Sequence, residues 1–287
     1  MKTRNNGYDL TIALNGFQLC YDDVGEGQTP IICLHGFPFD KTMWQEQLDF
    51  LKSSNRVIAC DIRGFGKSTD EETHLSIDLF SEDLIAFMDA LNIDKAIICG
   101  LSMGGFIALN AMKRFQNRFE ALILCDTQCI EDTVEVKEMR YKTIDDINNN
   151  GFTEFNEGFI ESVFHKNSFS DKKELVEQLR VVVFANSENI IKKGLVALAE
   201  RSETCSTLDE IVIPTLIICG REDEVTPLHQ SESMLSTIKD SILHIIENAG
   251  HVSNLEQPQE FNEQLLNFLS ELNNLDFEKI NGKKRMV

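Results

Sequence analysis

The segment GLSMG at residues 100–104 places a serine, Ser102, between two glycines. An apolar run, KAIIC, precedes this segment and a helical pattern, FIALNAMKRF, follows it, so the serine is expected at a strand-to-helix turn. The glycines allow the backbone to turn sharply, which would project the hydroxyl above a sheet. The N-terminus of the following helix favours negative charge nearby. The segment therefore predicts a nucleophilic serine.

A serine hydroxyl is a weak nucleophile at neutral pH and needs a general base. His251, in ENAGHVSNLEQP, is expected on a loop after the last strand and is the predicted base. His35, in LHGFP, also lies near a strand end, but the Gly36 turn beside it favours a backbone role. The remaining histidines have no comparable context and are interpreted as surface or packing residues: His74, His165, His229 and His244.

The base needs a carboxylate that orients its ring. Asp223, in ICGREDEVTP, lies just past the apolar run PTLIIC, and Glu222 and Glu224 flank it as competing candidates. The order Ser102, Asp223, His251 along the chain is that of one known triad topology. Asp223 is therefore the preferred acid.

The negative charge that develops on a substrate oxygen needs hydrogen-bond donors. The backbone N–H of Met103, directly after the serine, is one candidate donor. The loop after the run PIICL supplies the second, where Phe37 follows His35 and Gly36. Two such N–H groups would form an oxyanion hole.

Eight short apolar or β-branched runs are expected to form the strands that position these residues. They span residues 9–14, 17–23, 30–34, 56–61, 95–99, 120–125, 214–219 and 241–246. Asn15-Gly16 between the first two is a strong hairpin signal. The later runs are apolar almost throughout, as in parallel strands buried on both faces. Helical patterns at 76–92, at 102–115 and from Pro258 onward complete an α/β sheet covered on both sides.

One stretch interrupts the alternation of strands and helices. Residues 129–205 contain four helical patterns and no convincing strand. We therefore expect a first core part at 1–128, a helical cap at 129–205, a second core part at 206–274 and a solvated tail at 275–287.

The composition excludes several classes of protein. The 287 residues carry 27 Lys and Arg against 47 Asp and Glu, a formal charge of −20, which argues against a nucleic-acid binder. The hydrophobic fraction of 42% argues against disorder. No apolar run suits a signal peptide or a membrane span, so a cytoplasmic setting is expected. The eight cysteines include five at the ends of apolar runs and none in a zinc-ligand spacing, so buried thiols are expected rather than a disulfide framework.

Together these residues resemble the α/β-hydrolase superfamily over about residues 8–273. The motifs that carry the resemblance are LHGFP, DIRGFGKS, GLSMGG, GREDEVTP and NAGHVSNLEQP. The chain looks most like the branch of small esterases, 3-oxoadipate enol-lactonases and cofactor-free haloperoxidases. The resemblance implies a mostly parallel eight-stranded sheet with an inserted helical cap over the pocket, and no metal or organic cofactor. It implies Ser102 as nucleophile, His251 as base, Asp223 as its partner, and Phe37 and Met103 as the oxyanion hole.

The expected activity is hydrolysis of small to medium carboxylic esters or lactones by a monomer or homodimer, with no nucleic-acid or membrane partner. A serine at position 102 argues against dehalogenases and epoxide hydrolases, which use an aspartate there. Enol-lactonase, carbon–carbon bond hydrolase and perhydrolase or haloperoxidase activities stay open, as does a non-catalytic ligand receptor. The charge of −20 favours a neutral substrate, although salt screens it beyond roughly 8 Å. Arg140, Lys142 and Arg180 are candidates for binding a carboxylate.

Overall fold

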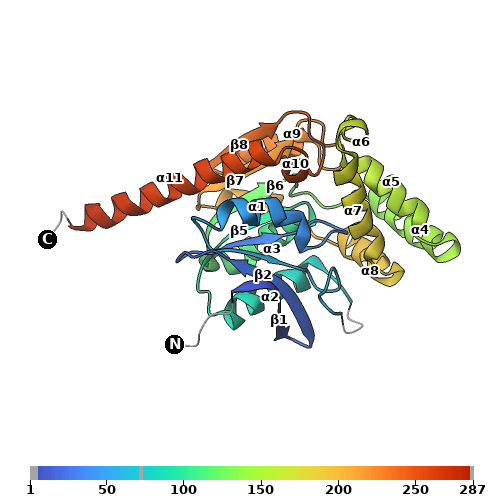
Figure 1. Ribbon diagram of the computed structural model, residues 1–287, viewed down its shortest axis with the longest axis horizontal. Coiled ribbons are helices and arrows are strands. Elements are labelled where there is room, and N and C mark those ends of the chain that lie inside the picture. The colour runs from blue at the N-terminus through green and yellow to red at the C-terminus, as the bar shows by residue number, and fades with distance from the viewer. Residues whose placement is uncertain (1–5, 71–73, 285–287) are drawn as a thin grey trace.

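The computed structural model describes the backbone of residues 6–70 and 74–284, and side chains up to residue 272. One sheet has the strand order β1-β2-β4-β3-β5-β6-β7-β8 (Figure 1). The strands are β1 (Gly7–Leu14), β2 (Phe17–Val24), β3 (Ile31–Leu34), β4 (Val57–Cys60), β5 (Ala96–Leu101), β6 (Phe119–Cys125), β7 (Thr215–Gly220) and β8 (Ser241–Ile246). β2 pairs antiparallel with β1 and β4, and all other pairs are parallel. The eight expected strands are confirmed.

Side chains of the central strands enter the core on both faces of the sheet. In β3, Ile32 and Leu34 belong to one hydrophobic cluster, whereas Ile31 and Cys33 belong to the other. The first cluster also takes side chains from α2 (Ile77–Ala90), α3 (Met103–Phe115) and α9 (Leu228–Thr237). The second takes them from α1 (Gln45–Leu51) and α11 (Pro258–Lys284). This two-sided burial explains why these runs are apolar almost throughout.

Local sequence signals place the ends of several elements. Asn15 and Gly16 both have positive φ, 33° and 86°, as the tight hairpin turn between β1 and β2 requires. Ser76 caps α2 by accepting a hydrogen bond from the Leu79 N–H at 3.1 Å. Pro258 is the first residue of α11.

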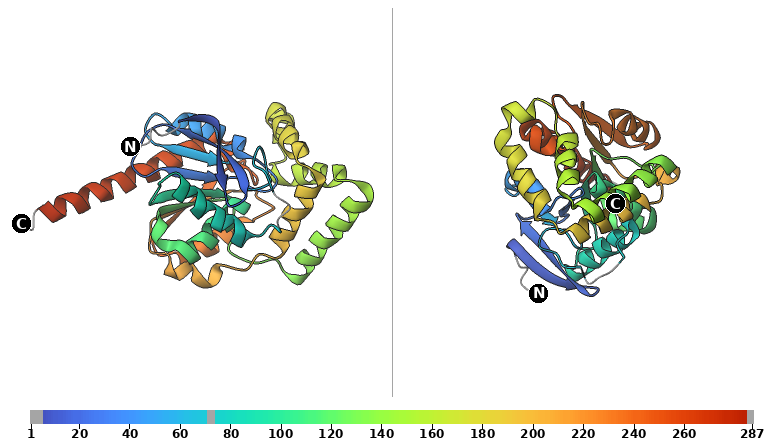
Figure 2. Two further views of the ribbon diagram at one scale, coloured as in Figure 1. Left: turned by 90° about the horizontal axis from the view of Figure 1, so that it is seen from below. Right: turned by 90° about the vertical axis from the view of Figure 1, so that its right-hand side faces the viewer.

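The last helix, α11, runs away from the sheet on the side opposite to α4–α8 (Figures 1 and 2). Its backbone continues to Lys284, so the segment expected as a tail, 275–287, is helical over most of its length. The side chains of this segment, which were expected to be solvated, lie outside the described residues. None of the helices in the described residues is both long enough and apolar enough to cross a membrane.

Five α-helices lie between β6 and β7, grouped at one end of the sheet (Figure 1). They are α4 (Val134–Asn150), α5 (Thr153–Val163), α6 (Ser168–Asp171), α7 (Lys173–Ala185) and α8 (Glu188–Ala199). α6 is a single short turn, and the four longer helices lie in the stretch where four helical patterns were expected. The chain leaves the sheet at the carboxyl end of β6, so this insertion starts at the edge where the neighbouring parallel strands β5 and β7 also end.

A disulfide joins the two ends of the insertion, so the expectation of thiols is wrong for two of the eight cysteines. Cys129 and Cys205 are bonded, with Cα atoms 4.9 Å apart across 76 residues of sequence. They meet because β6 and β7 are neighbours in the sheet, which returns the chain to its point of departure. A bridge that closes a loop of this length typically stabilises a fold by about 2–4 kcal/mol. The other six cysteines are free and buried, as expected.

Candidate active site

The carboxyl ends of four neighbouring parallel strands bring the candidate residues together. Ser102 follows β5, Asp126 follows β6, Asp223 lies just past β7, and His251 lies on the loop after β8. The carboxyl ends of parallel strands meet at one edge of a sheet, so residues far apart in sequence become neighbours there.

The backbone at Ser102 is held in an unusual conformation, with φ 53° and ψ −115°. Both flanking glycines are required by close packing. A Cβ on Gly100 would lie 2.3 Å from the Gly104 carbonyl oxygen, and a Cβ on Gly104 would lie 2.2 Å from that of Leu34. Thr127 Oγ1 donates to the Ser102 carbonyl oxygen at 2.8 Å, which fixes the turn from the next strand. Conformations of this kind persist only where the surroundings determine them, and they cluster at functional sites.

His251 and Asp223 form a buried pair. His251 Nδ1 lies 2.9 Å from Asp223 Oδ2 and 3.1 Å from Oδ1. The carboxylate also accepts hydrogen bonds from the N–H groups of Val225 and Thr226 and from Thr226 Oγ1, at 2.8, 2.9 and 2.7 Å. Burial opposes the charged imidazole, but attraction and hydrogen bonding to Asp223 outweigh it and raise the pKa of His251 above its ordinary value.

The two flanking carboxylates do not contact this histidine. Glu222 and Glu224 are exposed, and Glu222 instead accepts a hydrogen bond from the Ala249 N–H at 3.2 Å. The structure therefore pairs His251 with Asp223 rather than with either neighbour.

His35 is fully buried, its ring packs edge-on against Phe65 with centroids 5.8 Å apart, and its ring nitrogens contact backbone groups. Its Nδ1 lies 2.8 Å from the Gly36 carbonyl oxygen, and its Nε2 accepts from the Ile62 N–H at 2.9 Å. Burial lowers the pKa of His35 to about 4, so the ring stays neutral. Its role is structural, as the sequence favoured.

Ser102 and His251 line one cavity of about 150 Å³, which core and insertion enclose together. The other lining side chains are Phe37, Phe106, Gln128, Arg140, Phe155, Phe159, Ser162, Leu195, Leu198, Val225 and Thr226. A dry cavity of about this volume holds a molecule the size of benzene, so only a small group fits inside it.

One of the two candidate oxyanion residues, Phe37, lines this cavity, and the other, Met103, directly follows the lining residue Ser102. The ring of Phe37 lines it and packs against Phe155 and Phe159 of the insertion, with centroids 6.4 and 6.1 Å apart. Met103 is the first residue of α3, and N–H groups in the first turn of a helix have no acceptor within the helix.

Of the three cationic candidates, only Arg140 reaches the cavity. Lys142 is exposed on the same helix, α4. Arg180 is paired with Glu157 and with Glu177.

The loop that carries His251 is fastened to the insertion, which the sequence did not predict. The His251 N–H donates to the Val163 carbonyl oxygen at 2.8 Å. The buried carboxylate of Glu256 accepts from the N–H groups of Gly250 and His165, at 2.6 and 2.9 Å, and from Ser168 Oγ at 2.5 Å. The insertion therefore helps to fix the position of the histidine.

Asp126 is a second buried carboxyl group beside the pair, also missed from the sequence. Its Oδ1 accepts from the Gly220 N–H at 2.8 Å, and its Oδ2 lies 2.5 Å from Ser253 Oγ. Burial and repulsion from Asp223 raise the pKa of Asp126 well above the ordinary value, which favours its neutral form. The sequence feature that could have identified Asp126 is its position directly after an expected strand, in LILCD.

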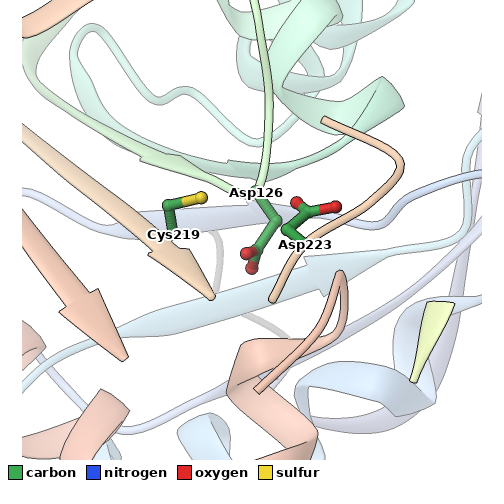
Figure 3. A group of neighbouring side chains, drawn as sticks. All are labelled: Asp126, Cys219 and Asp223. Atoms are coloured by element: carbon green, nitrogen blue, oxygen red, sulfur yellow. The ribbon is translucent and has the colours of Figure 1, made fainter. Parts of the chain in front are cut away.

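The side chains of Asp126, Cys219 and Asp223 lie together at the end of β7 and offer ligand atoms within 4.8 Å of one another (Figure 3). A metal site needs deprotonated ligands. Burial raises the pKa of Cys219 and that of Asp126 strongly, which disfavours their deprotonated forms, and Asp223 is bonded to His251. The donor set therefore does not fit a metal ion.

Asp126→Asn is expected to raise the stability of the protein at neutral pH. An unfolded aspartate loses its proton near pH 3.8, whereas folded Asp126 keeps its proton to much higher pH. Wild-type stability is therefore lost as the pH rises from the unfolded pKa through the folded pKa. Asparagine can accept the Gly220 N–H through its oxygen and can donate to Ser253 Oγ through its nitrogen, and it has no proton to lose. We expect the Tm of Asp126→Asn to be several degrees above that of the wild type at pH 7, since each kcal/mol of added stability raises the Tm by roughly 2–4 °C. The difference should vanish near pH 4.

Thermal unfolding of both proteins between pH 4 and 8 measures this gain. A lower Tm for Asp126→Asn at pH 7 would show that Asp126 is ionised in the folded protein.

Comparison with known proteins identifies the family of this chain. The family model described as "alpha/beta hydrolase fold" matches residues 29–258. The 3-oxoadipate enol-lactonase 2 of Acinetobacter baylyi is 30% identical over 253 residues, covering 88% of this chain and 93% of the relative. The 2-hydroxy-6-oxo-6-(2'-aminophenyl)hexa-2,4-dienoic acid hydrolase of Metapseudomonas resinovorans is 29% identical, covering 89% and 88%. An esterase of Thermogutta terrifontis superposes with a TM-score of 0.87 at 29% identity, covering 92% and 98%. The chain is therefore a hydrolase that belongs to the alpha/beta hydrolase fold family.

Proposed function

We propose that this hydrolase cleaves carboxylic esters or lactones of small to medium size through an acyl-enzyme on Ser102. The observation that carries the proposal is that Ser102 and His251 line one cavity while Asp223 holds His251 Nδ1 at 2.9 Å from behind. A serine, a histidine and an oriented carboxylate are the parts that acyl transfer requires.

In the proposed reaction His251 Nε2 takes the hydroxyl proton as Ser102 Oγ attacks the substrate carbonyl. Asp223 keeps the Nδ1 proton in place and stabilises the imidazolium that forms. The N–H groups of Met103 and Phe37 stabilise the tetrahedral oxyanion, and one such donor is worth about 3–4 kcal/mol. His251 then protonates the leaving alcohol, and water activated by His251 releases the acid.

The α4–α8 insertion acts as a cap in this proposal, because its side chains close the cavity opposite the sheet edge. An ester and a lactone share the same chemistry, since a lactone is a cyclic ester that opens to a hydroxy-acyl-enzyme. The enol-lactonase and esterase among the relatives support both substrate types.

The acyl-enzyme is the test of the proposal. Wild-type protein is mixed with p-nitrophenyl acetate, and samples are quenched in acid and digested. We expect a rapid release of p-nitrophenolate, stoichiometric with the protein, and an acetyl group on the peptide that contains Ser102. Turnover with no acetyl group on that peptide would contradict the acyl-enzyme mechanism, and no turnover would contradict the proposed ester hydrolysis.

A further inference from the structure

Glu256 carries a buried carboxylate that takes no part in the proposed proton transfers. It is the last residue of the short helix α10 (Ser253–Glu256) and is only 1% exposed. It is not among the residues that line the cavity of Ser102 and His251. A carboxylate so completely removed from solvent needs hydrogen-bond donors in place of water. The identity of those donors therefore indicates what Glu256 does.

The donors to Glu256 come from two separate segments of the chain. Its Oε2 accepts from the N–H of Gly250, the residue directly before His251, at 2.6 Å. Its Oε1 accepts from the His165 N–H at 2.9 Å and from Ser168 Oγ at 2.5 Å, and both of these residues lie in the insertion. One oxygen therefore binds the loop of the candidate base, and the other binds the insertion.

The backbones of the same two segments are in direct contact. The His251 N–H donates to the Val163 carbonyl oxygen at 2.8 Å. A Cβ on Gly250 would lie 2.8 Å from both the His165 nitrogen and the Val163 oxygen, so only glycine allows this approach. A displacement of the insertion at this contact must therefore displace the loop that carries His251.

The imidazole of His251 needs this support from its own backbone. Asp223 binds Nδ1 at 2.9 Å, which fixes one ring atom. The proposed reaction also needs Nε2, on the opposite side of the ring, to point at Ser102 Oγ. The second constraint on the ring is the position of the loop, and a misplacement of about 1 Å in an active site can lower the rate by about 10²-fold.

We propose that Glu256 is a positioning residue, which places His251 for proton transfer by binding the His251 loop and the insertion at the same time. The inference rests on the proposed function, since that function makes His251 the base. Glu256 acts through Gly250 and does not touch the reacting atoms. The insertion thus helps to set the base, in addition to closing the cavity.

Glu256→Gln tests this role, because glutamine has the same shape but only one side-chain oxygen. With its amide nitrogen toward the loop, the Gly250 N–H faces a donor, and with the nitrogen toward the insertion, the His165 N–H does. Either way one segment is no longer held. We expect kcat for p-nitrophenyl butyrate to fall by about 10- to 100-fold, the effect of one buried donor left unpaired. KM should change by less than about twofold, because Glu256 does not line the cavity.

The pH profile of Glu256→Gln separates positioning from a purely structural role. Burial lowers the pKa of His251, and the interactions with Asp223 and, to a smaller extent, Asp126 raise it by more. Glu256 is not among the groups that shift this pKa. A ring that has moved away from Asp223 loses part of the interaction, so the acidic limb of kcat/KM should move to lower pH. A variant that is only less stable, assayed well below its Tm, keeps the wild-type limb.

Ser168→Ala is a milder variant of the same contact, because it removes one donor to Oε1 and keeps the carboxylate. We expect its kcat to fall by about two- to tenfold at unchanged KM. Ser170→Ala is the matched control, since Ser170 is exposed on the same helix, α6, and donates to Asn167 and Asp171 instead. It should keep the wild-type kcat.

A wild-type kcat in Glu256→Gln would overturn the inference and leave the proposed function standing. A loss confined to KM, or a lower kcat with an unshifted acidic limb, would overturn it as well. If Glu256→Gln does not fold, a lower kcat for Ser168→Ala than for Ser170→Ala supports the inference, and equal values overturn it. No turnover by the wild type would overturn the proposed function itself.

Discussion

Ser102→Ala is expected to lower kcat for p-nitrophenyl butyrate by about 10⁴- to 10⁶-fold, the largest effect of any single change in this chain. The substitution removes the one oxygen that would form the acyl-enzyme. It leaves the strained turn in place, because the turn is fixed by backbone contacts and by Thr127 Oγ1, and not by the serine hydroxyl. The Tm and the far-UV circular dichroism spectrum should therefore match the wild type.

Ser162→Ala is the control for this experiment, since Ser162 lines the same cavity and its hydroxyl donates to the Phe159 carbonyl oxygen at 2.8 Å. Ser162→Ala should change kcat by less than about tenfold. The loss of one hydroxyl that only contacts the substrate costs far less activation free energy than the loss of the group that attacks it. Equal rates for wild type and Ser102→Ala would mean that the observed hydrolysis arises elsewhere.

Motifs that are local in sequence could be located before the structure was known. The turn at Ser102 needs two glycines within a five-residue segment, and close packing at Gly100 and Gly104 explains both. Strand ends could also be found, because strands buried on both faces are unbroken apolar runs. Asp223 and His251 were therefore identified from their places after two such runs.

Contacts between distant segments could not be predicted in this way. Cys129 and Cys205 are 76 residues apart, and only the adjacency of β6 and β7 brings them together. Of the three cationic candidates, the sequence could not show that Arg140 is the one that reaches the cavity, because a helical pattern does not show how a helix is rotated against its neighbours. Glu256 stood within a recognised motif, but its hydrogen bonds to His165 and Ser168 depend on how the insertion docks.

Asp223→Asn is expected to lower kcat by about 10⁴-fold with little change in substrate binding. An asparagine at this position can still accept the N–H groups of Val225 and Thr226 through its oxygen. Its amide nitrogen would then face His251 and donate to Nδ1. The ring proton would move to Nε2, which could no longer accept the proton of Ser102. The wrong tautomer, rather than a distorted site, would thus be the cause of the loss.

The pH dependence provides a second measurement for the same variant. In the wild type, burial lowers the pKa of His251, but the interaction with Asp223 raises it by more. Activity should therefore rise with pH through a pKa above the ordinary value of 6.5. Without the Asp223 carboxylate, burial is the largest remaining influence on the pKa of His251, and the acidic limb of kcat/KM should move to lower pH. Glu222→Gln and Glu224→Gln are the matched controls. Each removes a carboxylate that is next to Asp223 in the sequence but does not contact His251. If either control lowered kcat more than Asp223→Asn, the acid of the triad would be that glutamate.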